Sequence, residues 1–233
     1  IMGRRPDLVP KAYLVELEKL QERVKPLEFE QMRMAFEGEC ICSKIEEHSP
    51  FCYNCNDIHE IFEEFDEAPI ASASIAQVYK AKLRGKEVVV KVARPGVIDV
   101  INLDLEILWD FKSIFTRLLG FQKDFKVEDF LKEFRAMLQN ELDYRNEAFN
   151  MEKFRNNFKN FAGVKIPGVY WEYTRENILV MEFINGARLR DLPKGEFDRK
   201  KYAKLIASSF LKQLFEDGFF HADPHPGNIF ILE

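Results

Sequence analysis

The sequence has no block of basic residues, no long uninterrupted apolar run and no internal repeat. Its 34 Lys and Arg against 39 Asp and Glu leave a net charge of −5, so a nucleic-acid-binding role has little support. The longest apolar candidate, residues 97–121, is interrupted by six charged side chains and therefore cannot be a transmembrane helix. The content of 46% hydrophobic and 31% charged residues over the whole chain fits an ordinary globular protein of one large domain or two small ones.

The two ends of the chain also lack expected features. It opens with Ile1-Met2-Gly3, which is neither a signal peptide nor a natural start, and it stops at Glu233, just after a predicted strand begins. We therefore expect a fragment of a longer protein.

Cysteine is scarce, and all four residues fall within sixteen positions: Cys40, Cys42, Cys52 and Cys55. The spacing, C-x-C and then C-x-x-C after nine residues, suits a tetrahedral zinc site, with His48 and His59 as further candidate ligands. Reduced thiols in a loose insertion are one alternative, and disulfides in an oxidising compartment or a hyperthermophile are another. Because four thiolates leave no open coordination position, such a zinc site would be structural and not catalytic.

Hydrophobic periodicity and turn residues predict a mixture of helices and strands. Helical spacing favours helices over residues 7–24, 28–37, 99–119, 127–154 and 198–216, with a short helical turn at 189–192. Alternating and β-branched residues predict strands over 77–83 and 87–92, joined by a turn at 84–86, and a hairpin of residues 167–173 with 177–183. Asp198 is the predicted N-cap of the last helix and Gly218 its predicted stop.

The stretch from His221 to Asn228 has the spacing of a phosphoryl-transfer catalytic loop, H-x-D-x-x-x-x-N. In such a loop the Asp, here Asp223, accepts a proton or orients a nucleophile, and the Asn holds a metal ion that bridges phosphates. Its Pro and Gly residues exclude a regular helix or strand. A surface turn rich in His, Pro and Asp is the alternative interpretation.

Lys91 stands directly after three valines in a predicted strand. A Lys in such a strand is costly to bury unless its charge has a partner, although an edge-strand Lys that points to solvent is the alternative. The predicted helix over residues 127–154 carries three acidic residues, Glu141, Asp143 and Glu147. Asp143 and Glu147 share a helix face, whereas Glu141 is displaced around it; solvated charges are the alternative for all three.

These features follow the order of a protein kinase: phosphate loop, strand Lys, helix Glu, hinge and catalytic loop. The expected glycine-rich loop appears as A-x-A-x-x-A-x-V over residues 71–78, with alanine at each glycine position. A Cβ there restricts the backbone and its approach to phosphates, so we expect an altered nucleotide preference. The hinge would be the run Met181-Glu182-Phe183-Ile184.

The alanine loop, the helix motif E-L-D-Y-R-N-E-A-F-N at 141–150 and the loop H-A-D-P-H-P-G-N at 221–228 resemble the UbiB (AarF-domain) atypical kinase-like family. The resemblance covers nearly the whole chain except an apparent insertion at about residues 38–57. It implies an α+β, protein-kinase-like bilobal fold that is truncated. Residues 1–62 would form an N-terminal helical extension with the Cys-rich insertion, 63–184 an N-lobe with an antiparallel sheet, and 185–233 the beginning of a helical C-lobe.

The resemblance also implies a function: an ATP- and magnesium-dependent atypical kinase or ATPase that supports synthesis of ubiquinone-like isoprenoid quinone lipids. The expected partners are nucleotide and a quinone-type lipid or membrane surface, in a cytoplasmic protein with peripheral membrane contact. Lys91 would pair with the nucleotide phosphates and Glu147, Asp223 would be catalytic, and Asn228 would bind magnesium. The remaining nucleotide-site residues would be Ala71, Ser72, Ala73, Ser74, Ala76, Val78, Met181, Glu182 and Ile184, with Glu141 and Asp143 as an E-x-D motif facing the N-terminal extension.

Two family motifs are not in the sequence. A Lys-x-Gly-Gln motif would lie before Ile1, and the D-F-G motif would follow Glu233. We therefore expect the 233-residue chain alone to lack ATP turnover. A protein Ser/Thr kinase and a nucleotide-binding pseudokinase or lipid-binding scaffold remain the alternative functions.

Overall fold

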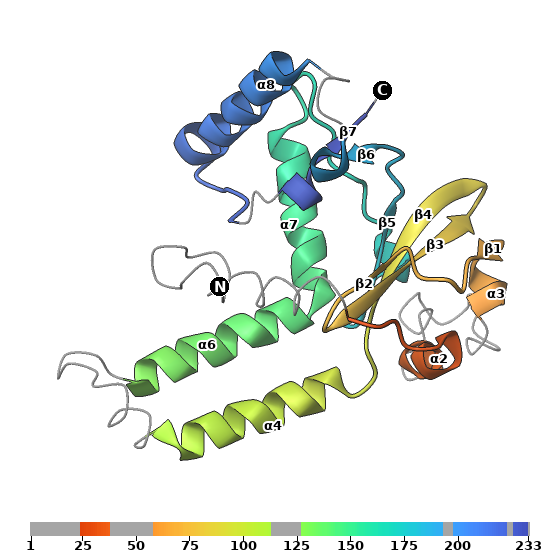
Figure 1. Cartoon of the computed structure of the whole chain (residues 1–233), viewed down its shortest axis with the longest axis vertical. Coiled ribbons are helices and arrows are strands. Elements are labelled where there is room, and N and C mark those ends of the chain that lie inside the picture. Colours follow the sequence, from red (N-terminus) through yellow and green to blue (C-terminus); the bar gives the residue numbers. More distant parts are fainter. Residues whose placement is uncertain (1–23, 38–57, 113–126, 193–197, 223–225, 233) are drawn as a thin grey trace. The chain divides into compact units, whose positions relative to one another are not determined.

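A computed structural model describes residues 24–37, 58–112, 127–192, 198–222 and 226–232 (Figure 1). The chain forms two compact units. Unit 1 comprises residues 1–148 and 169–181, and unit 2 comprises residues 149–168 and 182–233. The predicted helix at 7–24 and the four cysteines therefore lie almost wholly outside the described residues.

Unit 1 contains an antiparallel sheet built around one long hairpin. Its strand order is β1 (Glu64–Phe65), β3 (Ala76–Leu83), β4 (Lys86–Ala93) and β5 (Ile178–Glu182), and β2 (Ala71–Ser72) also pairs with β3. The β3–β4 register runs without interruption from Ala76 opposite Ala93 to Leu83 opposite Lys86. A turn is predicted at residues 84–86, and the structure forms it from Arg84 and Gly85 alone, with φ of 51° and 73°, which is the left-handed backbone that two-residue hairpin turns require.

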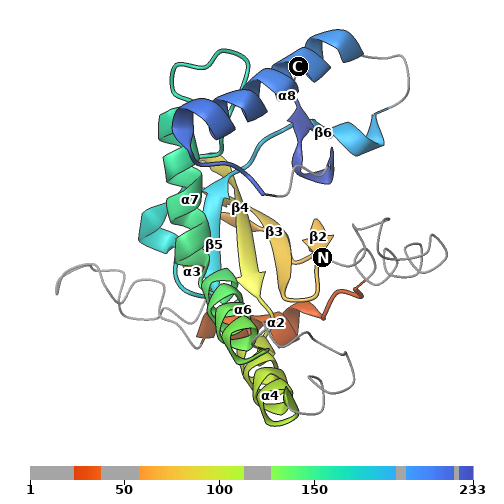
Figure 2. The ribbon, with the colours of Figure 1, turned by 90° about the vertical axis from the view of Figure 1, so that its left-hand side faces the viewer.

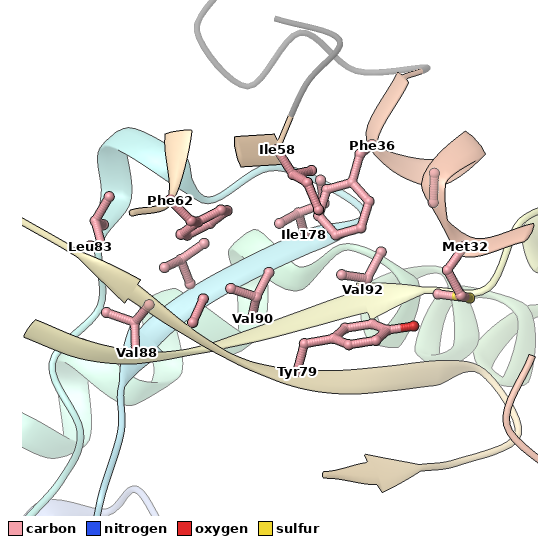
Figure 3. Packing of buried hydrophobic residues seen from close by; sticks show 13 residues of the cluster. Met32, Phe36, Ile58, Phe62, Tyr79, Leu83, Val88, Val90, Val92 and Ile178 are labelled. Carbon is pink, nitrogen blue, oxygen red and sulfur yellow. The ribbon is translucent and has the colours of Figure 1, made fainter. Parts of the chain in front are cut away.

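One face of this sheet is covered by helices α2 (Phe29–Glu37) and α3 (Ile58–Ile61). Figure 3 shows their side chains meeting those of the strands. Because strand side chains alternate, Val88, Val90 and Val92 of β4 all point into this core and are fully buried. The other members are Met32, Ala35, Phe36, Ile58, Phe62, Tyr79, Ala81, Leu83, Ile178 and Val180. Each large side chain buried here stabilises the unit by roughly 1.5–3 kcal/mol.

Alternation also places Val89, Lys91 and Ala93 on the opposite face of β4. Val89 and Ala93 are buried, whereas Lys91 is half-buried. The sheet is therefore covered on both faces, and Lys91, in the middle of β4, lies on the face opposite the core that α2 and α3 form. This position decides which elements Lys91 can contact.

Helices α4 (Val97–Asp110) and α6 (Val127–Leu142) lie side by side (Figures 1 and 2). The prediction of a single helix over residues 127–154 is wrong, because α6 ends at Leu142 and a separate helix, α7, spans Tyr144–Asn157. The break falls at Asp143, whose Oδ1 accepts the backbone N–H of Arg145 at 3.0 Å in the manner of an N-cap. Hydrophobic periodicity continues through such a break and does not reveal it.

The predicted hairpin of residues 167–173 with 177–183 is only partly formed. Val169 makes an isolated antiparallel bridge to Met181, and the chain then turns into a short 3-10 helix, Trp171–Tyr173. Thr174 directs this turn, since its hydroxyl donates to the Tyr170 carbonyl and accepts the N–H of Val180. A side chain that offers the backbone such bonds competes with continued strand pairing.

Unit 2 contains α8 (Arg199–Lys212), a π-helical turn (Gln213–Asp217) and a two-stranded antiparallel sheet of β6 (Ala187–Arg188) and β7 (Phe230–Ile231). The side chain of Asp198 accepts the N–H of Lys201 at 3.0 Å, so the predicted N-cap is present. Gly218 ends the helical segment with φ of 58°, as predicted. No helix among the described residues is long and apolar enough to cross a membrane.

Candidate functional site

The alanine loop is the turn between β2 and β3. Ala71 pairs with Val78 and Ser72 with Gln77, and the N–H of Ala73 donates to the Ala76 carbonyl at 2.8 Å to close the loop. Ala73 and Ser74 at its tip are exposed. None of the loop residues has positive φ, because Arg84 is the only non-glycine residue of the described chain in that region. Alanine is therefore compatible with the backbone of this loop.

Lys91 lies directly opposite Val78 in the β3–β4 register, so the alanine loop and the strand Lys belong to one hairpin. The Lys91 Nζ is 2.6 Å from Glu147 Oε2 of α7 and 4.5 Å from the centroid of the Tyr144 ring. The side chains of Lys91 and Glu147 are 22% and 40% exposed. The cation thus has a carboxylate partner and an aromatic neighbour, while part of the Lys91 side chain remains exposed.

Tyr144 occupies the first turn of α7 and is 1% exposed. Burial raises the pKa of Tyr144, and the neighbouring charges of Glu147 and Glu141 raise it further. A neutral ring beside Lys91 supplies an aromatic face without adding a competing negative charge. Tyr144 is a site residue that the sequence interpretation did not select.

Asp143 and Arg145 organise the start of α7. The Arg145 guanidinium donates to both carboxylate oxygens of Asp143, at 2.9 and 2.8 Å, and to Glu176 Oε1 at 2.6 Å. The hydrogen bond from Arg145 holds the pKa of Asp143 below its usual range. These bonds fix the helix that carries Glu147. Glu141, the other member of the predicted E-x-D motif, is exposed on α6.

The predicted hinge follows the end of β5. The Glu182 N–H donates to the Gly168 carbonyl at 2.8 Å, and the Glu182 carboxylate accepts from Lys165 Nζ at 2.5 Å and from the Gly168 N–H at 3.2 Å. Burial alone would raise the pKa of Glu182, but these donors outweigh it and lower the pKa. Met181 and Ile184 are half-buried on either side of it.

The predicted catalytic loop is described only in part. Asp223 lies outside the described residues, whereas Asn228 is exposed at the end of a 3-10 turn, Pro226–Asn228. The N–H of His221, at the start of the loop, donates to Gln213 Oε1 at 2.9 Å. Gln213 is 7% exposed and belongs to the π-helical turn, a distortion that is common near functional sites. Sequence reasoning missed Gln213, although its place in a helix before the loop is a usable signal.

Candidate metal ligands are also described only in part. Cys40, Cys42, Cys52 and Cys55 lie outside the described residues, so the zinc prediction stays a prediction. Within the described part of the chain, no group of three or more His, Cys, Asp or Glu side chains is arranged to hold a metal ion. Asn228, the predicted magnesium ligand, lies within the described residues. It belongs to unit 2, whereas Lys91 and Glu147 belong to unit 1.

The arrangement in unit 1, an antiparallel sheet with a strand Lys paired to a helix Glu, defines a protein-kinase-like fold. A solved structure of Rv3197 with erythromycin, from Mycobacterium tuberculosis, has the same fold, with a TM-score of 0.71 over 98% of this chain and 55% of that chain at 24% identity. The predicted α+β, kinase-like fold is thereby confirmed.

The family model of the ABC1 atypical kinase-like domain matches residues 19–233, and the chain belongs to this family. It is 37% identical to the chloroplastic protein ACTIVITY OF BC1 COMPLEX KINASE 8 of Arabidopsis thaliana, over 97% of this chain and 28% of that protein. It is 38% identical to a protein of Cellvibrio japonicus named "Probable protein kinase UbiB", over 99% of this chain and 40% of that protein. The resemblance to the UbiB family is confirmed, and the chain spans less than half the length of these relatives.

Proposed function

We propose that this chain carries the nucleotide-binding part of an atypical kinase or ATPase that uses ATP and magnesium. The observation that supports this most directly is the 2.6 Å ion pair between Lys91 and Glu147. A strand Lys with a helix Glu is the pair that must form for a kinase to hold its nucleotide phosphates. The partial exposure of Lys91 and its place opposite Val78 of the alanine-loop motif support contact of its ammonium with a phosphate group.

We expect these residues to bind a nucleotide together with magnesium. Lys91 would neutralise phosphate charge, Glu147 would hold Lys91 in place, and the alanine loop would cover the phosphates. Asn228 would be one magnesium ligand, and Asp223 would accept the proton of, or orient, the attacking group. When bound, magnesium supplies charge neutralisation between phosphate oxygens.

For the whole protein, we propose a role in the synthesis of isoprenoid quinone lipids, with a quinone-type lipid or membrane surface as partner. The support is the family membership and the relatives named UbiB. Stimulation of ATP hydrolysis by a quinone precursor or by lipid vesicles would favour this role. Transfer of labelled phosphate to peptides would instead identify a protein kinase, and nucleotide binding without turnover would identify a pseudokinase.

Calorimetric titration of the purified chain with MgATP tests nucleotide binding. We expect Lys91→Met to weaken binding roughly tenfold or more, because a hydrogen bond to a charged group contributes about 1.5–3 kcal/mol. Lys82→Met is the matched control, since Lys82 lies in the same hairpin but pairs with Glu64 at the exposed edge. Equal binding by the wild type and Lys91→Met would refute the proposed site.

A further inference from the structure

Gln77 has no exposed surface, although it lies within the alanine-loop motif of residues 71–78, at the start of β3. Its Oε1 accepts the backbone N–H of Leu27 at 2.5 Å, and its Nε2 donates to the Leu27 carbonyl at 3.3 Å and to the Tyr79 hydroxyl at 2.6 Å. One side-chain amide thus pairs with both backbone groups of Leu27, as a neighbouring strand residue would. Residue 27 precedes helix α2 and lies fifty positions away in sequence.

Arg94 makes a second connection to the same N-terminal stretch. It follows Lys91 by three residues, and its Nη2 donates to the Lys25 carbonyl and to the Ser72 hydroxyl, both at 2.9 Å. Its backbone N–H donates to the Ile75 carbonyl within the alanine loop, also at 2.9 Å. Arg94 therefore joins the loop to residue 25 from the end of the strand that carries Lys91.

The two connections converge on one rung of the sheet. Ser72 and Gln77 are direct partners in the β2–β3 register, and this rung is the base of the alanine loop. Ser72 is tied to Lys25 through Arg94, and Gln77 is tied to Leu27 directly. Any displacement of residues 25–27 must therefore break these hydrogen bonds, of which those to Leu27 are partly buried, or move the base of the loop.

A purely stabilising role for Gln77 and Arg94 would require no such convergence. Asn177 provides the comparison, because its Nδ2 donates to the Ala35 carbonyl at 3.1 Å and so ties α2 to the sheet next to β5, at a strand other than those of the alanine loop. Among the hydrogen bonds described above, the one from Asn177 holds α2 to the sheet, whereas those from Gln77 and Arg94 meet at the loop that would cover the phosphates.

We propose that Gln77 and Arg94 are positioning residues that hold the main chain of residues 25–27 against the base of the alanine loop, and that nucleotide affinity depends on this docking. The proposal rests on the proposed function of the site. When the stretch is undocked, the loop samples positions that do not bind nucleotide, and the apparent dissociation constant rises in inverse proportion to the fraction of molecules that remain competent to bind.

The test combines amide hydrogen exchange over residues 72–76 with calorimetric titration of MgATP. Gln77→Met keeps the volume and removes both bonds to Leu27, and Arg94→Lys keeps the charge but loses the guanidinium fork. We expect either change to speed exchange at Ala73 and to raise the dissociation constant about fivefold. The control, Asn177→Leu, removes the tie to Ala35 and should leave both quantities within about twofold of the wild type.

Each outcome decides the matter. Wild-type exchange or wild-type affinity in Gln77→Met overturns the proposal, and so does an equal change in Asn177→Leu, because that would reflect general loss of stability. Should Gln77→Met not fold, Arg94→Lys at its half-buried position decides by the same two measurements. A wild type that binds no MgATP overturns the proposed function and this proposal together, whereas normal wild-type binding with unaltered variants overturns this proposal alone.

Discussion

The Lys91–Glu147 pair should show measurable coupling in a double-mutant cycle of Lys91→Met and Glu147→Gln. At 2.6 Å and an effective dielectric constant of about 20, the gross Coulomb attraction is roughly 6 kcal/mol. The net value is far smaller, because both groups lose hydration and remain 22% and 40% exposed to screening solvent. We expect a coupling free energy of about 1 kcal/mol, which is between that of surface pairs and that of buried charged hydrogen bonds.

Urea denaturation of the four proteins measures this coupling through the free energy of unfolding. A loss of about 1 kcal/mol corresponds to roughly 2–4 °C in Tm for a chain of this size. The exposed pair Lys82–Glu64 in the same sheet serves as the control cycle, and it should show a smaller coupling that added salt abolishes. Additivity of the Lys91 and Glu147 single changes within about 0.3 kcal/mol would refute the reasoning, because the two groups would then not interact.

Three further predictions concern other parts of the molecule. Arg145 lowers the pKa of Asp143, so the stabilising contribution of this carboxylate is present above about pH 4 and is lost as pH falls below it. Asp143→Asn should therefore reduce the loss of unfolding free energy at acid pH. An unchanged acid side of the stability–pH curve would contradict this. Gln213→Met should speed amide exchange of His221 roughly fivefold, whereas the exposed Gln139→Met should not; equal rates would exclude the positioning role. Protein purified without chelator should carry about one zinc per chain; no zinc and four titratable thiols would remove the predicted cysteine site.

The order of the elements in unit 1 is well predicted from the sequence. The β3–β4 hairpin is recognisable because β-branched residues flank a turn whose Gly85 accepts positive φ. Asp198 and Gly218 mark the ends of the last helical segment, since capping depends on chemistry local to those positions. The resemblance names Lys91 and Glu147 as partners, and the structure places their charged atoms 2.6 Å apart.

Other features depend on contacts between distant residues and are not readable from local patterns. The break at Asp143 follows from its bond to Arg145 and from the contact of the Tyr144 N–H with the Glu176 carbonyl, thirty-two residues further along the chain. Periodicity alone continues smoothly through this position. The role of Gln77 was equally hidden, because a polar residue in an alternating strand is expected to face solvent.

The hydrogen bonds that join residues 25 and 27 to the base of the alanine loop illustrate the same limit. Leu27 and Lys25 contribute only backbone groups to Gln77 and Arg94, so no side-chain motif at positions 25–27 indicates the contact. Backbone groups must be paired wherever they are buried, but sequence does not tell which side chain will pair them. Tyr144 was missed for a related reason, since its aromatic ring reads as a core residue.

The most direct test of the central claim is an experimentally determined structure of the chain with a non-hydrolysable ATP analogue and magnesium. We predict that the phosphates lie within hydrogen-bonding distance of Lys91 Nζ, with the Lys91–Glu147 pair intact and the alanine loop over the phosphates. A nucleotide bound elsewhere, or one that leaves Lys91 without a phosphate contact, would contradict the account.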